Sequence, residues 1–162
     1  MRRFEGFMKG VNLGGWISQF DVYSEEHFST FIQEEDIKRI KGMGFDHVRV
    51  PVDYNVLETE EGEVIESGYQ HLVDCLNWCK KYDLRMLIDV HEVYGYSFDP
   101  LKDMDREVFF YDEAMQARFF KLWENIATRF GGEHERVAFE LLNEVVLSEV
   151  YEAWNKVAKK AI

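Results

Sequence analysis

Polar side chains that could transfer protons or form hydrogen bonds with a ligand lie where the apolar segments of this sequence end. Asn12, Arg49 and His91 lie at or just past the ends of three such segments, and Asn143 and Glu144 end a fourth, in the run FELLNEV. A carboxylate that loses solvation at such a position can donate a proton near neutral pH. An amide beside it can bond a substrate hydroxyl through a contact that strengthens in the transition state. The residue types indicate acid–base chemistry at one end of a set of strands.

These residues also have structural readings. Asn143 and Glu144 could cap the helix that follows, and position alone does not choose between capping and catalysis. Arg49 needs a carboxylate or sugar partner, and it could form a structural ion pair with Asp53 or Asp89. Asp89 lies two residues before the histidine on the same strand face, so we expect it to point inward as support.

The loops at the same end are rich in aromatic residues. Trp16, Tyr94, Tyr96 and Phe98 could stack on sugar rings, with simple packing within each loop as the alternative. His91 has its own alternative as a hydrogen-bonded structural histidine, although it shares this rim. Whether these rings stack on sugars or pack within their loops, polar and aromatic groups lie around one opening.

The elements that must position these groups alternate between strands and helices. Apolar runs predict strands, and apolar residues at helical spacing predict helices between them. The predicted strands are 7–13, 45–52, 84–91 and 136–144, and the predicted helices are 34–44, 69–83, 112–131 and 150–162. Consecutive βα units joined by short connections predict either a doubly wound sheet or half of an eight-stranded (β/α) barrel.

The position of the polar residues favours the half-barrel. Active sites of such barrels form at the carboxyl ends of the strands, where these residues lie. The run NLGGW lacks the third glycine of a dinucleotide-binding loop, so a doubly wound binding domain is weakly supported. We therefore predict an α/β chain of four βα units, a single (β/α)4 half-barrel over residues 1–162. Its inner face would be lined by Val11, Val48, Val50, Leu87 and Leu142.

Composition limits the possible partners. The 162 residues carry a net charge of -12 and are 46% hydrophobic, which predicts a folded core and argues against nucleic acid or anionic membrane as partner. The N-terminal MRRFEGFMKG lacks the apolar core of a signal peptide and no run is long enough to span a bilayer, so we expect a cytoplasmic chain. Cys75 and Cys79 are expected to pack as small core residues, because a metal site needs further ligands nearby.

Four blocks of the sequence carry a family resemblance. KGVNLGGWISQFD, GFDHVRVPVDY, CLNWCKKYDLRMLIDVHE and VAFELLNEV together resemble the N-terminal half of a glycoside hydrolase family 5 endoglucanase (cellulase) of the clostridial type. The resemblance implies a retaining hydrolase of β-1,4-glucans or related β-glycans that uses no cofactor. It also implies that Arg49 orients the nucleophile, His91 contacts sugar, Asn143 precedes the acid, and Glu144 is the general acid/base. Asn12, Trp16, Glu92 and Tyr96 are expected to contact substrate.

Two departures from the family pattern matter. Many relatives carry a second histidine where this chain has Glu92, and a complete barrel takes about 250 residues. The sequence ends before the strands that would bring the nucleophilic glutamate. We therefore expect a half-barrel that is active only with a second half, as a complementing chain or a homo-oligomer. The alternative is a catalytically inactive fragment or assembly scaffold.

A pair of identical chains could close such a body. Two-fold closure would place His91 or Glu92 where the seventh strand of a barrel belongs, opposite the partner's Glu144. Glu92 could then supply the second carboxylate. Its alternative is an ordinary solvated role on a rim loop.

Overall fold

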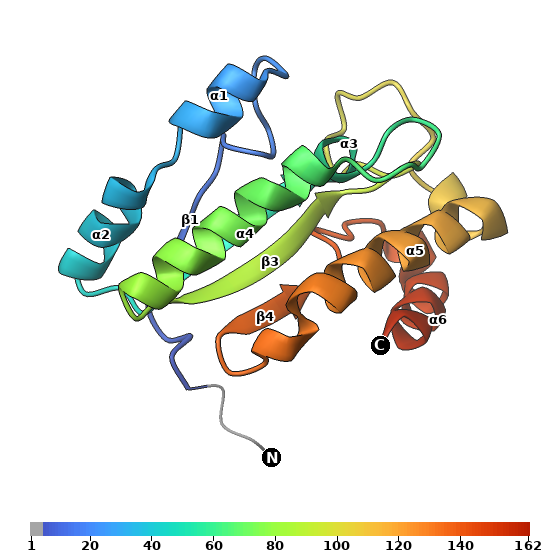
Figure 1. Cartoon of the computed structure of the whole chain (residues 1–162). Helices are drawn as coiled ribbons and strands as arrows, with labels where there is room; N and C mark the ends of the chain where they lie inside the picture. The colour runs from blue at the N-terminus through green and yellow to red at the C-terminus, as the bar shows by residue number, and fades with distance from the viewer. Residues whose placement is uncertain (1–4) are drawn as a thin grey trace.

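A computed structural model describes residues 5–162 of the chain. Its centre is a parallel four-stranded sheet in the order β1-β2-β3-β4 (Figure 1). The strands are β1 Gly10–Asn12, β2 His47–Asp53, β3 Arg85–Glu92 and β4 Val137–Glu140. The register places Asn12 beside Arg49 and Arg49 beside Leu87, so the carboxyl ends of all four strands meet at one edge.

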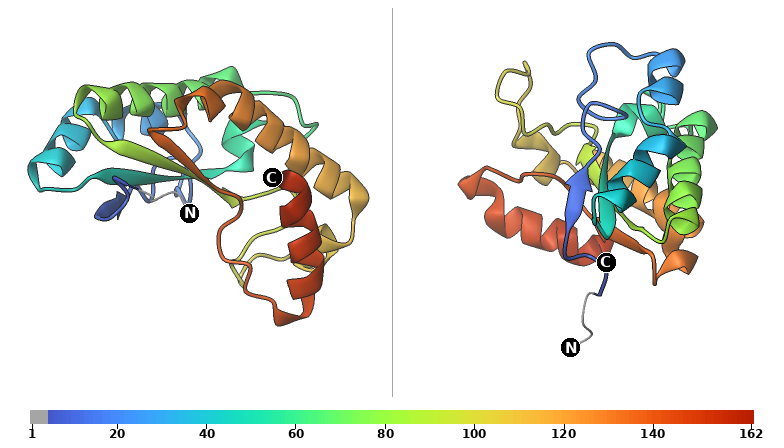
Figure 2. Two further views of the ribbon diagram at one scale, coloured as in Figure 1. Left: turned by 90° about the horizontal axis from the view of Figure 1, so that it is seen from below. Right: turned by 90° about the vertical axis from the view of Figure 1, so that its left-hand side faces the viewer.

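Helices follow the strands in the sequence and cover one face of the sheet. The longer helices are α2 Glu34–Gly42, α4 Glu66–Lys81, α5 Glu113–Phe130 and α6 Tyr151–Ala161; the short elements are α1 Glu25–Thr30, α3 Tyr54–Leu57, η1 Val108–Phe110, η2 Gly131–Glu133 and η3 Ser148–Val150. Figures 1 and 2 show α2, α4 and α5 on the same side of the strands, while α6 projects beyond β4. Among residues 5–162, none of the helices has the length and apolar character needed to cross a bilayer. Because the four parallel strands carry helices on one face, the four βα units form half of a barrel, and its inner face is open.

The four predicted strands and the four longer predicted helices are all present, with shifted ends. The two short α-helices, α1 and α3, were not predicted. In α1, the Ser24 hydroxyl caps the helix by accepting a hydrogen bond from the His27 amide at 3.1 Å. The helix has only six residues, which are too few for a helical repeat of apolar residues to be seen in the sequence. Helix α3 is a single turn that follows β2 directly.

The side chains of β2 point to the opposite faces of the sheet from those predicted. Arg49 contacts groups of other strands on the inner face, so Val48 and Val50, which alternate with it, point to the helices. Both valines are fully buried, as expected for side chains that are covered by helices. Side chains on the open inner face would be more exposed. The prediction that these two valines line the inner face is therefore wrong.

The core lies between the sheet and its helices. Cys75 and Cys79 are completely buried free thiols on α4, which confirms their prediction as small core residues. Gly68 lies where α4 crosses α3 so closely that a Cβ there would stand 1.9 Å from the carbonyl oxygen of Val56. This close packing fixes the end of β2, because α3 follows that strand without a loop.

Candidate active site

Arg49 is the centre of a charged network on the inner face of the sheet. Its guanidinium donates from Nε to Glu140 Oε2 at 2.8 Å and from Nη2 to Glu140 Oε1 at 2.8 Å, a two-pronged contact. Nη2 also lies 2.8 Å from Asp89 Oδ2, so the ion pair that was the structural alternative for Arg49 forms with Asp89. The Glu140 hydrogen bond is the largest of the effects that raise the pKa of Arg49. The arginine is therefore a fixed positive charge that joins β2, β3 and β4.

The same guanidinium orients two amide side chains. It donates to Asn12 Oδ1 and to Asn143 Oδ1, each at 3.0 Å. Asn143 is buried, and its Nδ2 has no hydrogen-bond partner within residues 5–162. Because the carbonyl end of this amide is held by Arg49, the amino end is left as a donor for an incoming oxygen atom.

His91 is held by the buried Asp89. The imidazole Nδ1 lies 2.6 Å from Asp89 Oδ2, and since a carboxylate accepts, Nδ1 is the donor. Burial raises the pKa of the Asp89 carboxyl, against the lowering effects of the His91 hydrogen bond and the Arg49 charge. His91 Nε2 is buried without a partner in the described part of the chain. Asp89 thus acts as support, as predicted.

Glu144 occupies a strained turn just after this network. Its side chain is exposed, and its φ of 43° lies in the left-handed region that non-glycine residues rarely adopt. The Tyr96 hydroxyl donates to the Glu144 carbonyl oxygen at 2.7 Å and accepts from the Val146 amide at 3.4 Å. Helix α6 starts only at Tyr151, so Glu144 does not cap it. The capping interpretation is wrong.

Glu92 is not a solvated rim residue. It is only 6% exposed, accepts a hydrogen bond from the Ser97 hydroxyl at 2.7 Å and forms an ion pair with Lys102. The expectation of an ordinary surface role is therefore wrong. Its carboxylate is bound by groups of its own β3 loop.

The aromatic rings predicted to stack on sugars lie mainly in the interior. Trp16 is 1% exposed and donates from Nε1 to the Phe28 carbonyl oxygen at 2.6 Å, and Tyr96 is fully buried. Both are packing residues, so the expectation of a stacking surface does not hold for them. Tyr94 is half-buried beneath Arg118, whose guanidinium lies 4.1 Å from the ring centre. Phe98 is half-buried against the His91 ring and stays near the network.

Glu140 is the site residue that sequence reasoning missed. It lies within the predicted fourth strand, in FELLNEV, three residues before Asn143. A carboxylate inside an apolar strand needs a partner, and Arg49 was the unpaired cation on a neighbouring strand. The need of this carboxylate for a cationic partner was the signal in the sequence that could have identified Glu140. No group of three or more histidine, cysteine or acidic side chains arranged to hold a metal ion is found within residues 5–162.

Comparison with known proteins identifies the family. The description "Cellulase (glycosyl hydrolase family 5)" matches residues 8–162. Endoglucanase C of Acetivibrio thermocellus is 46% identical over 158 residues, covering 96% of this chain and 45% of that protein. Cellodextrinase A of Ruminococcus flavefaciens is 44% identical, covering 98% and 46% respectively.

A solved structure gives the same architecture. Endoglucanase Cel5A from the hyperthermophilic Thermotoga maritima superposes with a TM-score of 0.73 at 24% identity, covering 96% of this chain and 46% of that one. The fold is therefore half of a (β/α)8 barrel. This chain belongs to glycosyl hydrolase family 5, and it spans about half the length of the curated relatives that it matches.

Proposed function

We propose that this chain supplies the acid/base half of an endo-β-1,4-glucanase active site. Glu144 protonates the leaving glycosidic oxygen and then activates water for the second step of a retaining reaction. The observation that carries the proposal is the Arg49 network, which holds the Asn143 amide beside Glu144 with its amino group unoccupied. Family membership and relatives described as endoglucanases support this choice of reaction.

The neighbouring groups have distinct roles in this scheme. Asn143 Nδ2 donates to a sugar hydroxyl next to the scissile bond, a contact that gains strength as the transition state forms. His91 Nε2 accepts from a second hydroxyl, because Asp89 holds the proton on Nδ1. Neither role needs a metal or an organic cofactor.

A retaining reaction also needs a nucleophile. The two carboxyl groups must lie about 5–5.5 Å apart. Glu140 does not fill this role, since both of its oxygens are bound by Arg49. Glu92 is held by Ser97 and Lys102. We therefore assign the nucleophile to a second half, supplied by a complementing chain or by another copy of this one.

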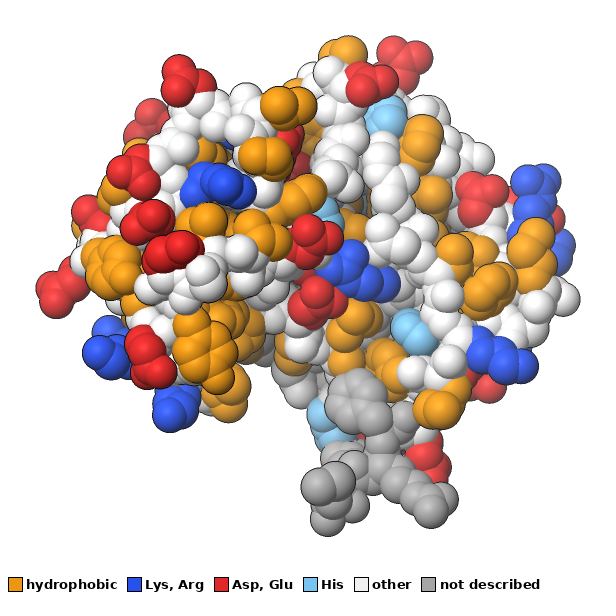
Figure 3. All heavy atoms as spheres, turned by 180° about the vertical axis from the view of Figure 1, so that it is seen from behind, with side chains coloured by type: hydrophobic (Ala, Val, Ile, Leu, Met, Phe, Trp, Pro, Cys, Tyr) orange, Lys and Arg blue, Asp and Glu red, His pale blue; other side chains and the backbone are white. Residues whose placement is uncertain are grey.

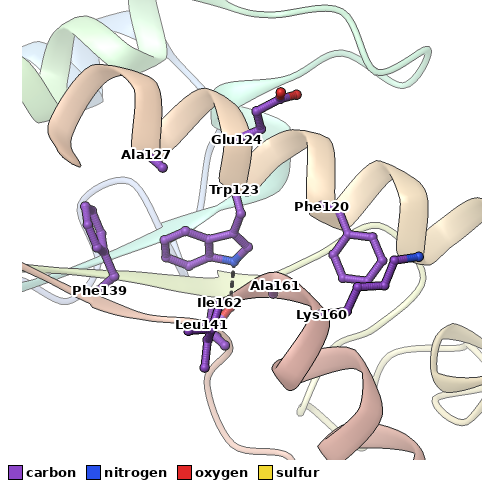
Figure 4. A pocket seen from close by; sticks show the side chains of 9 residues that line it. All are labelled: Phe120, Trp123, Glu124, Ala127, Phe139, Leu141, Lys160, Ala161 and Ile162. Carbon is purple, nitrogen blue, oxygen red and sulfur yellow. Dashed lines mark hydrogen bonds between the residues drawn. The ribbon is translucent and has the colours of Figure 1, made fainter.

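The surfaces available for a second half support this assignment. Figure 3 shows the face opposite α4 and α5, where acidic and basic side chains gather at the centre between hydrophobic ones. Beyond β4 there is a groove of about 640 Å³ between α5 and the end of α6. Figure 4 shows the Trp123 ring between Phe139 and Phe120 in this groove, with Ile162 below the indole in this view. Phe139 is 39% exposed and Ile162 is 97% exposed, so this apolar edge is suited to contact with a further strand.

The experiment measures hydrolysis of lichenan or carboxymethylcellulose by the chain alone and after mixing with the C-terminal half of a related endoglucanase. We expect no family-like turnover from a monomer verified by light scattering, and turnover after complementation. Glu144→Gln should leave folding nearly unchanged and reduce the complemented rate by about 10²–10⁴-fold, because the amide has no transferable proton. Glu149→Gln, an exposed carboxylate five residues later, is the matched control.

Three outcomes would contradict the proposal. Robust turnover by the monomer would show that no second half is needed. Complemented activity that survives Glu144→Gln would remove this residue as the acid. A folded complex without activity would favour the inactive scaffold.

A further inference from the structure

The strained turn at Glu144 is held by one side chain from the loop after β3. The Tyr96 hydroxyl donates to the Glu144 carbonyl oxygen at 2.7 Å and accepts from the Val146 amide at 3.4 Å. Burial raises the pKa of the Tyr96 hydroxyl, so the group keeps its proton and remains a donor near neutral pH. One hydroxyl group therefore bonds both to the residue with the left-handed backbone and to the residue two positions later.

Tyr96 is itself fixed by a tight turn and by aromatic packing. Val93 and Tyr96 exchange two backbone hydrogen bonds, at 3.2 and 3.0 Å, around Gly95, whose φ of 88° is left-handed. The Tyr96 ring is fully buried and lies edge-on to Phe110, with 5.1 Å between the ring centres. A side chain that is already ordered by its backbone and its ring loses little further conformational entropy when its hydroxyl forms a hydrogen bond. Tyr96 is therefore a rigid support for the turn.

The direction of the Glu144 side chain depends on this backbone. The Asn143 amide donates to the Val90 carbonyl oxygen at 3.1 Å, which attaches the residue before the turn to β3. The Glu144 side chain is exposed, so its carboxylate points where its own backbone directs it. Returning φ from 43° to an ordinary right-handed value would rotate the Cα–Cβ bond by about 100°. Because misplacing a reacting group by about 1 Å can cost about 10²-fold in rate, a rotation of this size would separate the carboxyl group from the glycosidic oxygen.

We propose that Tyr96 is the positioning residue of the general acid/base, because its hydroxyl keeps the Glu144 backbone left-handed and so directs the carboxyl group toward the glycosidic oxygen. This inference rests on the proposed function and deepens it, since it adds a residue that acts through Glu144 without touching the sugar. Tyr96 was expected to contact substrate, and this role is one that a buried tyrosine can fill.

The first measurement uses the isolated chain and does not depend on turnover. Backbone 13C chemical shifts of the 13C,15N-labelled chain report φ and ψ at Glu144. We expect left-handed values in the parent and a shift toward right-handed or extended values in Tyr96→Phe, which keeps the buried ring and lacks the hydroxyl. Tyr69→Phe is the matched control, because Tyr69 is also buried but its hydroxyl has no hydrogen-bond partner within residues 5–162. The control should leave the shifts of Glu144 unchanged.

The second measurement separates placement of the acid from general damage to the fold. It compares kcat/KM of the complemented parent and the complemented Tyr96→Phe variant on cellotetraose and on 2,4-dinitrophenyl β-cellobioside. The dinitrophenolate group leaves without a proton, so the first chemical step on this substrate does not need the acid. We expect kcat/KM of the variant to fall about 10–100-fold on cellotetraose and less than about threefold on the dinitrophenyl substrate. Tyr69→Phe should match the parent on both.

Three results would overturn the inference. Left-handed shifts that persist in Tyr96→Phe would show that the hydroxyl does not hold the turn. An undiminished kcat/KM on cellotetraose would show that holding the turn does not matter for the reaction. An equal loss on both substrates would show that the variant damages the site without selectively misplacing the acid.

Failure of the proposed function gives a different pattern. A complemented parent that is inactive on both substrates would contradict the acid/base proposal, and with it the catalytic part of this inference. The structural part would then be decided by the chemical shifts of Glu144 alone. An active parent with unaltered shifts and rates in Tyr96→Phe would leave the acid/base proposal standing and remove Tyr96 as its positioning residue.

Discussion

Replacing Asp53 by asparagine should stabilise the chain near neutral pH. The asparagine oxygen can still accept the Gln19 amide, but the side chain no longer carries a buried charge. In the folded chain the pKa of Asp53 is about 6, against an ordinary value of 3.8. Since each pKa unit corresponds to about 1.4 kcal/mol, the charged carboxylate lowers the free energy of unfolding by about 3 kcal/mol near neutral pH.

The effect depends on pH in a defined direction. An acid whose pKa is raised by folding binds its proton more tightly in the folded state, so its contribution to stability is greatest below 3.8 and is lost as pH rises through about 6. Asp53→Asn removes this loss. The variant should therefore unfold at a temperature about 6–12 °C higher than the parent near neutral pH, with the advantage disappearing at about pH 4.

Urea unfolding of parent and variant at several pH values measures this difference directly. The exposed Glu63→Gln substitution serves as the control, and it should show no comparable pH-dependent gain. A difference between parent and Asp53→Asn that does not change between about pH 4 and pH 7 would refute the reasoning. A less stable variant near neutral pH would refute it too, and would mean that the carboxylate is satisfied by the protein.

Two further substitutions test packing and the strained turn. Gly68→Ala should lower the free energy of unfolding by about 1–3 kcal/mol, because the added Cβ meets the Val56 carbonyl. Gly42→Ala, whose added Cβ has nothing within 4 Å, should instead raise the free energy of unfolding by up to about 1 kcal/mol. Denaturant unfolding curves of the two variants measure both effects. Tyr96→Phe should cost about 1–2 kcal/mol and shift the amide signals of the turn, because the Glu144 carbonyl loses its donor. An unchanged spectrum at residues 144–146 would show that the hydroxyl does not hold this turn.

The architecture could be predicted because its long elements have strong periodicity. Helices such as α4 and α5 span four turns or more, and the strands between them are continuous apolar runs. The ends were less accurate: the first strand was predicted over 7–13 and is Gly10–Asn12, since pairing with β2 alone decides its length. Short helices such as α3 have no period to detect.

The site was predictable in position but not in its contacts. Parallel strands bring their carboxyl ends together, so Arg49, His91 and Asn143 were expected at one edge, and they lie there. The orientation of β2 was misjudged because strands of parallel sheets are apolar on both faces and show no alternation. Glu140 was missed for a related reason, since its partner lies 91 residues away in the sequence.

The left-handed backbone at Glu144 limits how this position can change. Glycine would relieve a strain of about 1–3 kcal/mol, but it would delete the carboxylate. Glutamine would keep the strain and lose the proton. Random substitution followed by selection for stability alone would therefore be expected to enrich glycine here, while selection for hydrolysis with a complementing half would retain glutamate. The residue recovered at this position reports which of the two requirements has shaped a given lineage.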